Sequence, residues 1–185
     1  IETSNVRGVN IQPVAYFGRK NGNIDRKNRV TMTDAIRMIE EQTKKMIIKK
    51  DFLYPAANEM RRLHIYLPDS YNETEERYPV MYFFDGHNLF LKEDTTYGTT
   101  WGLKEFMESW SKDMIIVGIE CGHEGYERLY EYMPYPSTWR DMNDAAILGE
   151  ETFQWIIHEI KPMIDQEYRT YPFRECTAIG GASMG

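Results

Sequence analysis

The sequence lacks an apolar run of the roughly 20 residues that a membrane-spanning helix needs. Its 185 residues also show no basic start followed by an apolar stretch, which is the pattern of a secretory signal. Positive charge is scarce, because 22 Lys and Arg stand against 29 Asp and Glu, for a formal net charge of -7. Nucleic-acid binding needs a basic surface. We therefore expect a cytoplasmic protein with neither a membrane nor a nucleic-acid partner.

Cysteine is nearly absent, since only Cys121 and Cys176 occur. Their separation fits neither a disulfide framework nor a zinc-finger spacing, so both are expected to be small buried side chains. A metal-dependent hydrolase built on Cys121, His123 and nearby acids is an alternative, although its ligand spacing is poor. The sequence predicts no cofactor and no metal, and it makes no prediction of oligomeric state.

What the chain does contain is typical of one globular domain, with 42% hydrophobic and 28% charged residues. Residues 1–45 carry little periodicity and are interpreted as an irregular N-terminal extension, with one short amphipathic helix predicted from Thr31 to Lys45. The pattern changes at Met46. We expect residues 46–185 to form the domain that carries the function.

The predicted elements of this domain begin with a β-hairpin, Ile47 to Tyr54 and Arg61 to Leu67, in which His64 is expected to face outward. Two apolar runs without alternation then predict strands buried on both faces, and a third, short strand follows near the C-terminal end. Two segments with helical spacing separate them, and the second is expected to bend at Pro162. In chain order these are residues 79–84, 101–110, 114–119, 150–168 and 176–180. The alternation predicts an α/β fold with a parallel sheet covered by helices on both faces, and a ligand beyond the carboxyl ends of the strands.

The last five residues, Gly181 to Gly185, fit the pattern G-x-S-x-G at the end of a predicted strand. This is the pattern of a nucleophile elbow, where Ser183 would attack a carbonyl and the N–H of Met184 would stabilise the resulting oxyanion. The second N–H should come from the loop after the first parallel strand, from His87 or from its neighbour Asn88. The alternative is a glycine-rich turn with an uninvolved serine.

Several blocks resemble, in order, the esterase family of α/β hydrolases that includes esterase D, enterochelin esterases, feruloyl and acetylxylan esterases and mycolyltransferases. The blocks are residues 61–68, 78–86, 115–119, 131–134, 160–165, 168–170 and 178–185. The resemblance implies the α/β-hydrolase fold, incomplete at the C-terminus, and hydrolysis of carboxylic esters through an acyl-enzyme on Ser183.

The resemblance also defines a departure. In such enzymes the acid and the histidine of the triad follow the serine, whereas the four histidines here, at positions 64, 87, 123 and 158, all precede Ser183. We therefore expect the chain to be the N-terminal part of a serine esterase and to be inactive by itself. An acyltransferase of the same fold and a non-catalytic binding module are the alternatives.

Candidate groups for holding a small-molecule or carbohydrate ester are Asp85, Arg128, Tyr132 and Trp139. The last three belong to a loop region rich in aromatic side chains, which stack on sugar or phenolic rings, and arginine, which binds carboxylates. The alternative is that these side chains pack the loop onto the body of the domain.

Overall fold

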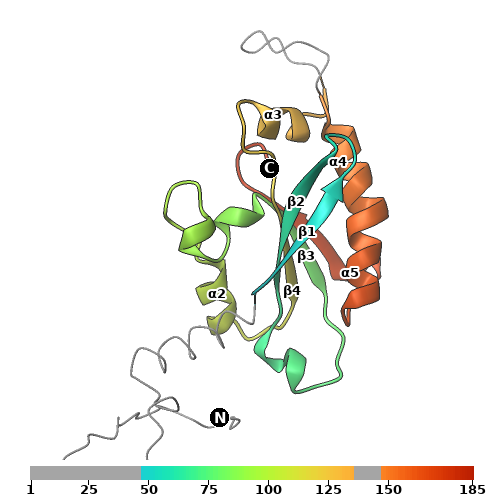
Figure 1. Cartoon of the computed structure of the whole chain (residues 1–185). Helices are drawn as coiled ribbons and strands as arrows, with labels where there is room; N and C mark the ends of the chain where they lie inside the picture. Colours follow the sequence, from blue (N-terminus) through green and yellow to red (C-terminus); the bar gives the residue numbers. More distant parts are fainter. Residues whose placement is uncertain (1–46, 136–146) are drawn as a thin grey trace, which may run out of the picture. The chain divides into compact units, whose positions relative to one another are not determined.

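The computed structural model describes residues 47–135 and 147–185. The predicted helix of residues 31–45, the rest of the N-terminal extension and Trp139 lie outside the described residues. The described chain forms a five-stranded sheet with the order β1-β2-β4-β3-β5 (Figure 1). The strands are β1 Ile47–Tyr54, β2 Glu59–Tyr66, β3 Val80–Phe84, β4 Ile115–Ile119 and β5 Thr177–Gly180.

The strand pairing confirms the expected topology. β1 and β2 form an antiparallel hairpin with Ile47 opposite Tyr66, closed by a turn in which Asn58 has φ 53°. β2 is antiparallel to β4, and β3 is parallel to both β4 and β5. The chain crosses from β3 to β4 on one side and then from β4 back past β3 to β5 on the other, and this reversal creates the switch point where open α/β sheets bind ligands.

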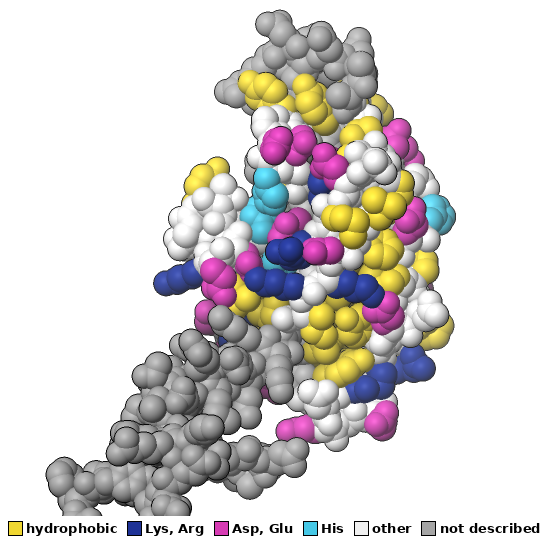
Figure 2. Space-filling model, in the orientation of Figure 1, with side chains coloured by type: hydrophobic (Ala, Val, Ile, Leu, Met, Phe, Trp, Pro, Cys, Tyr) yellow, Lys and Arg dark blue, Asp and Glu magenta, His cyan; other side chains and the backbone are white. Residues whose placement is uncertain are grey.

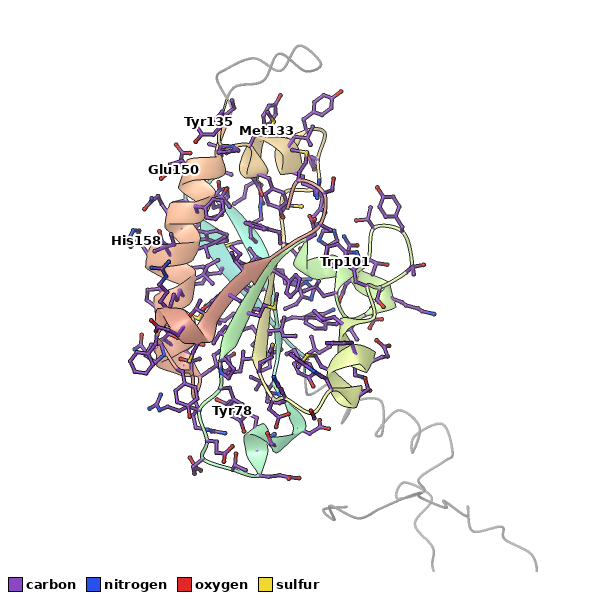
Figure 3. The ribbon with its side chains drawn as sticks, turned by 180° about the vertical axis from the view of Figure 1, so that it is seen from behind. Tyr78, Trp101, Met133, Tyr135, Glu150 and His158 are labelled. Carbon is purple, nitrogen blue, oxygen red and sulfur yellow. The ribbon has the colours of Figure 1, made fainter. Side chains whose placement is uncertain are left out.

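Helices cover both faces of the sheet, as the sequence predicts (Figures 1 and 3). The α-helices are α2 Leu103–Ser109, α3 Glu127–Tyr132, α4 Gly149–Trp155 and α5 Lys161–Glu167, and a π-helix, η7 Ile156–Ile160, joins the last two. The short 3-10 turns are η2 Asp69–Asn72, η3 Gly86–Asn88, η4 Lys92–Asp94 and η8 Arg174–Cys176. None of the helices in the described ranges is long and apolar enough to cross a membrane.

Two hydrophobic clusters lie on opposite sides of the sheet. The long helix formed by α4, η7 and α5 packs against one face of β4. Its residues in this cluster are Trp155, Ile156, Ile160 and Ile164, and those of β4 are Ile115, Val117 and Ile119. Ile116, which points the other way, packs with Leu89, Phe90 and Met107. Alternate residues of one strand thus serve two cores, which is why the strand is apolar throughout.

The long helix buries a different face from the one that the sequence predicts. The sequence pattern places Phe153 and Ile157 on the buried stripe, yet they are 41% and 49% exposed, while Trp155 is buried. The π-helix is the reason, because a wider turn shifts the faces of the residues on either side of it. Pro162 lies in the first turn of α5, where its missing N–H is tolerated. Figure 3 shows Glu150 and His158 on the outer side of this helix.

The expectation that His64 faces outward is wrong. The side chain is 1% exposed, because β2 lies between β1 and β4 and the strand is covered on both faces. Its Nε2 lies 2.6 Å from Oε1 of Glu120, the residue that follows β4. The alternation of polar and apolar residues in β2 therefore reflects a buried polar contact.

Candidate active site at the carboxyl ends of the parallel strands

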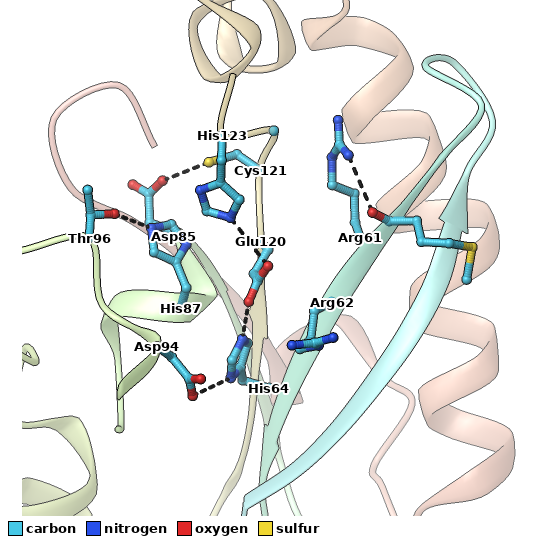
Figure 4. Close-up of polar contacts among 12 residues, drawn as sticks. Arg61, Arg62, His64, Asp85, His87, Asp94, Thr96, Glu120, Cys121 and His123 are labelled. Carbon is cyan, nitrogen blue, oxygen red and sulfur yellow. Dashed lines mark hydrogen bonds and ion pairs between the residues drawn. The ribbon is translucent and has the colours of Figure 1, made fainter. Parts of the chain in front are cut away.

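Three loops meet at one end of the sheet because the strands that precede them are parallel and adjacent. They are Asp85 to Asn88 after β3, Glu120 to His123 after β4, and Gly181 to Gly185 after β5. This is the location at which the sequence predicts a ligand site. Side chains of the first two loops are drawn in Figure 4.

The turn after β5 presents Ser183 in a conformation that is rare for a residue with a side chain. Its φ is 61°, in the left-handed region, and the residue is exposed. The Gly185 N–H donates to the Ala182 carbonyl across the turn at 3.1 Å. A Cβ on Gly181 would lie 2.2 Å from the carbonyl carbon of Gly185, so the turn has no room for a side chain there. This is the tight strand-ending turn that an elbow requires.

Asp85, in the loop after β3, has the same left-handed backbone conformation. Among the described residues other than glycine, only Asn58, Asp85 and Ser183 have positive φ. Asn58 belongs to the hairpin turn, where asparagine is common, whereas Asp85 and Ser183 end adjacent strands. Such strain costs about 1–3 kcal/mol at each residue and clusters at functional sites. The two conformations therefore support a functional role for this end of the sheet.

Asp85 and Arg128 form a bidentate ion pair that also reaches the elbow. Nε and Nη2 of Arg128 each donate to one Asp85 oxygen at 2.7 Å, and the hydrogen bond to Asp85 is the main cause that raises the arginine pKa. The Tyr132 hydroxyl donates to Asp85 at 3.3 Å, and Nη2 also donates to the Ala182 carbonyl at 3.4 Å. Asp85 is 3% exposed. Three of the predicted substrate-binding residues thus bond to one another, and their contact with a substrate stays a prediction.

The loop after β3 is held close to β4 by two glycines. A Cβ on Gly86 would lie 2.3 Å from the carbonyl carbon of Gly118, so only glycine permits this approach. The Asn88 N–H is already used, because it donates to the Asp85 carbonyl at 2.9 Å. In the described ranges, the N–H groups of His87 and Met184 have no acceptor within the protein. Of the two predicted alternatives for the second donor, this geometry favours His87.

Three side chains lie together next to this loop, although the sequence associates only two of them, Cys121 and His123. His87, Cys121 and His123 place one ligand atom each within 4.8 Å of one another, and the two rings meet edge to face at 4.6 Å. Burial, followed by the nearby His123, lowers the pKa of His87. Burial, followed by the charge of Asp85, raises the pKa of the Cys121 thiol to about 12. No spacing signal links His87 to the other two, because only the pairing of β3 with β4 brings them together.

Glu120 links His64 to His123. Its Oε1 contacts His64 at 2.6 Å and its Oε2 contacts Nε2 of His123 at 3.3 Å. Burial alone would raise the pKa of Glu120, but the hydrogen bond from His64 and the histidine charges outweigh burial and lower it. The sequence analysis missed Glu120, since a glutamate after a strand carries no signal until its partners are known.

Comparison with solved structures shows where the fold is shared. The chain superimposes on an IroE-like serine hydrolase from Shewanella oneidensis with a TM-score of 0.57 and 23% identity, over 75% of this chain and 43% of that one. The BES protein from Bacillus cereus gives a TM-score of 0.53 and 17% identity, over 89% and 57% of the two chains. These similarities establish the α/β-hydrolase-like fold.

Sequence relatives agree with the fold. The uncharacterized protein YbbA of Bacillus subtilis is 25% identical over 127 residues, which are 68% of this chain and 47% of the relative. Esterase MT1326 of Mycobacterium tuberculosis is 29% identical over 124 residues, which are 66% of this chain and 24% of the relative. The chain therefore spans half or less of the length of these relatives. The family description "Putative esterase" matches residues 55–185, and on this match the chain belongs to that esterase family.

Proposed function

We propose that this chain carries the nucleophile of a serine carboxylic ester hydrolase. Membership of the esterase family supports ester hydrolysis as the activity. The observation that carries the mechanism is the left-handed backbone of Ser183, with φ 61°, exposed at the end of β5. A hydroxyl in that position can attack a carbonyl carbon, form an acyl-enzyme and release the alcohol.

The negative charge that develops on the carbonyl oxygen would be met by two main-chain donors, the N–H groups of Met184 and His87. Such donors lower the barrier because they are already oriented, and each is worth about 3 kcal/mol. The Gly86–Gly118 contact and the Arg128 bond to Ala182 support this proposal, because they fix the β3 loop and the elbow in place.

The triad would be completed by an acid and a histidine supplied from sequence downstream of Gly185, in the order that α/β hydrolases follow. The coverage of 47% of YbbA and 43% of the Shewanella hydrolase supports this proposal. The chain alone would then be inactive. Its substrate would be a small-molecule or carbohydrate ester, a class consistent with the similar structure described as a ferulic acid esterase, at a TM-score of 0.51.

The test is hydrolysis of short aryl esters by the protein extended through its downstream sequence. Ser183→Ala is expected to lower kcat by about 10⁴-fold or more. Ser109→Ala is the matched control, because Ser109 is exposed and its hydroxyl bonds only to the Phe106 carbonyl of its own helix. Undiminished turnover in the Ser183 variant would refute the mechanism. Addition of an alcohol acceptor distinguishes a hydrolase, which releases acid, from an acyltransferase, which forms a new ester.

A further inference from the structure

We propose that His87, Cys121 and His123 bind one transition-metal ion of the Zn²⁺ class. The three side chains come from the loops after β3 and β4 and offer two imidazole nitrogens and one sulfur. Nitrogen and sulfur donors of this kind select Zn²⁺ and similar borderline-soft ions over Mg²⁺ and Ca²⁺. The site shares His87 with the proposed oxyanion hole, where that residue would use its main-chain N–H, and the ester chemistry itself needs no metal.

An unpartnered buried nitrogen points to this ligand. His87 is 4% exposed, and its Nε2 contacts the Thr96 hydroxyl at 3.1 Å and the Asn88 amide at 3.0 Å. Its Nδ1 is buried and, within the described ranges, has no hydrogen-bond partner. Buried polar atoms nearly always have a hydrogen-bond partner in native proteins, so a buried nitrogen without one requires an explanation. A metal ion shared with His123 and Cys121 supplies one.

His123 is already oriented as a metal ligand. Its Nε2 lies 3.3 Å from the Glu120 carboxylate, which leaves Nδ1 as the nitrogen available for a metal. A carboxylate on the far nitrogen is the usual support of a metal-binding histidine. Glu120 is itself held by His64 at 2.6 Å. In Figure 4 His123 lies between Cys121 and Glu120, with His87 next to it.

The distances need only a small adjustment. Ligand atoms around tetrahedral zinc lie about 3.5 Å apart, given Zn–N and Zn–S bonds of about 2.0–2.3 Å. The ligand atoms of His87, Cys121 and His123, which lie within 4.8 Å of one another, must therefore come closer by about 1 Å. His123 can close this gap by a small rotation, because its side chain is 52% exposed. Figure 2 shows histidine reaching the surface of this face among acidic and basic side chains.

Metal binding requires two protons to leave or move. The Cys121 thiol, now 3.6 Å from Asp85, must bind as a thiolate and release its proton. The side-chain Oδ1 of Asn88 accepts from the Thr96 N–H at 3.2 Å. The side-chain Nδ2 of Asn88 therefore donates to Nε2 of His87, and the ring proton of His87 lies on Nδ1. On binding, this proton moves to Nε2, where the Thr96 hydroxyl accepts it and the Asn88 amide turns away.

The direct test is Co²⁺ titration of the 185-residue chain without an affinity tag, followed by displacement with Zn²⁺. We expect one equivalent to bind with a thiolate-to-cobalt charge-transfer band. Cys121→Ser should abolish the band, and His123→Ala should weaken affinity by about 10- to 100-fold without unfolding the chain, as judged by circular dichroism. Cys176→Ser and His158→Ala are the matched controls and should bind as the unmodified chain does. Absence of saturable binding, or a band that survives in Cys121→Ser, overturns the proposal.

A second variant tests coordination through Nδ1 of His87. Asn88→Asp keeps an acceptor for the Thr96 N–H and adds one for a proton on Nε2, so it should free Nδ1 and tighten Zn²⁺ binding by about tenfold. Asn72→Asp adds the same charge on the 3-10 turn after β2 and controls for nonspecific attraction. Equal or weaker affinity in Asn88→Asp than in Asn72→Asp counts against the proposed ligand atom.

Discussion

Two arginine–carboxylate ion pairs join α3 to β2 and to the loop after β3, and they differ in which other groups they contact. Arg61 of β2 donates to Glu131 of α3 at 2.6 Å, and their side chains are only 7% and 5% exposed. Arg128 of α3 donates to Asp85 after β3 at 2.7 Å, and its side chain is 31% exposed. Each guanidinium also lies over a tyrosine ring.

We call Arg61–Glu131 the inner pair and Arg128–Asp85 the outer pair. The inner pair supports the scaffold, whereas the outer pair contacts the candidate site. Glu131 uses its second oxygen to accept from the Gly122 N–H at 2.9 Å, so the inner pair holds the main chain of the loop after β4. Arg128 instead reaches the Ala182 carbonyl in the elbow. The same chemistry thus serves stability at one position and the placement of Ser183 at the other, and variants can separate the two.

The largest effect is expected from Glu131→Ala. It leaves Arg61 buried without its main partner and removes the acceptor of the Gly122 N–H, so the free energy of unfolding should fall by about 3–5 kcal/mol. Urea denaturation measures this. Glu59→Ala removes a 48% exposed carboxylate from the same guanidinium and should cost about 1 kcal/mol or less. Equal losses in the two variants would mean that burial does not distinguish them.

Arg128→Lys should affect catalysis more than folding. Lysine keeps the charge but cannot make the bidentate contact or reach both Asp85 and Ala182, so stability should fall by about 1–3 kcal/mol. On the proposed function, kcat of the extended protein should also fall, because the elbow loses an anchor. Glu131→Gln, assayed at a temperature where it remains folded, should retain its kcat. If kcat drops by the same factor in both variants, the division between scaffold and site is wrong.

A smaller, pH-dependent effect should separate His87 from Arg61 and Arg128, whose raised pKa values keep both guanidinium groups charged. Burial lowers the pKa of His87 below the usual 6.5, so the folded protein binds fewer protons than the unfolded chain. The stability that depends on neutral His87 is therefore present above pH 6.5 and is lost as pH falls toward the lowered value. Denaturation with a chelator present, between about pH 7.5 and about pH 5.5, should show a shallower decline for His87→Gln. Parallel pH curves for the two proteins would argue against this account.

The smallest effect is expected one residue along β2 from Arg61. Arg62 pairs with Asp51 at 2.9 Å, but the two side chains are 44% and 52% exposed. Exposed pairs contribute little, so Arg62→Ala should change the unfolding free energy by no more than about 0.5 kcal/mol. A loss comparable to that of Glu131→Ala would remove the basis for ranking these pairs by burial.

The sheet could be predicted from the sequence because its signals are local. Unbroken apolar runs mark β3 and β4, the glycine-rich turn marks the end of β5, and their order with the intervening helices determines which strands are parallel. The turn at Ser183 was equally predictable from its flanking glycines. The buried face of the long helix was not, since the π-helix at Ile156–Ile160 depends on packing against the sheet and leaves no pattern that periodicity detects.

The polar contacts of the site could not be predicted, because they join residues that are distant in the sequence. His64 reaches Glu120 across 56 positions, and Asp85 reaches Arg128 across 43. His87 joins Cys121 and His123 only because Gly86 and Gly118 let two loops touch. A polar residue beside a strand end can equally face solvent, and only the fold decides.

The π-helix also bears on how the long helix can vary in length. A π turn holds about one residue more than an α turn, so deleting a residue there would restore a regular helix. Because the wider turn absorbs that residue, Ile160 and Ile164 would still face the sheet after the deletion. The same deletion within α4 or α5 would instead rotate every later residue of the helix by about 100° and turn part of its packed face away from the sheet. The π-helix is thus a point at which the helix can lose a residue and keep its contacts with the sheet.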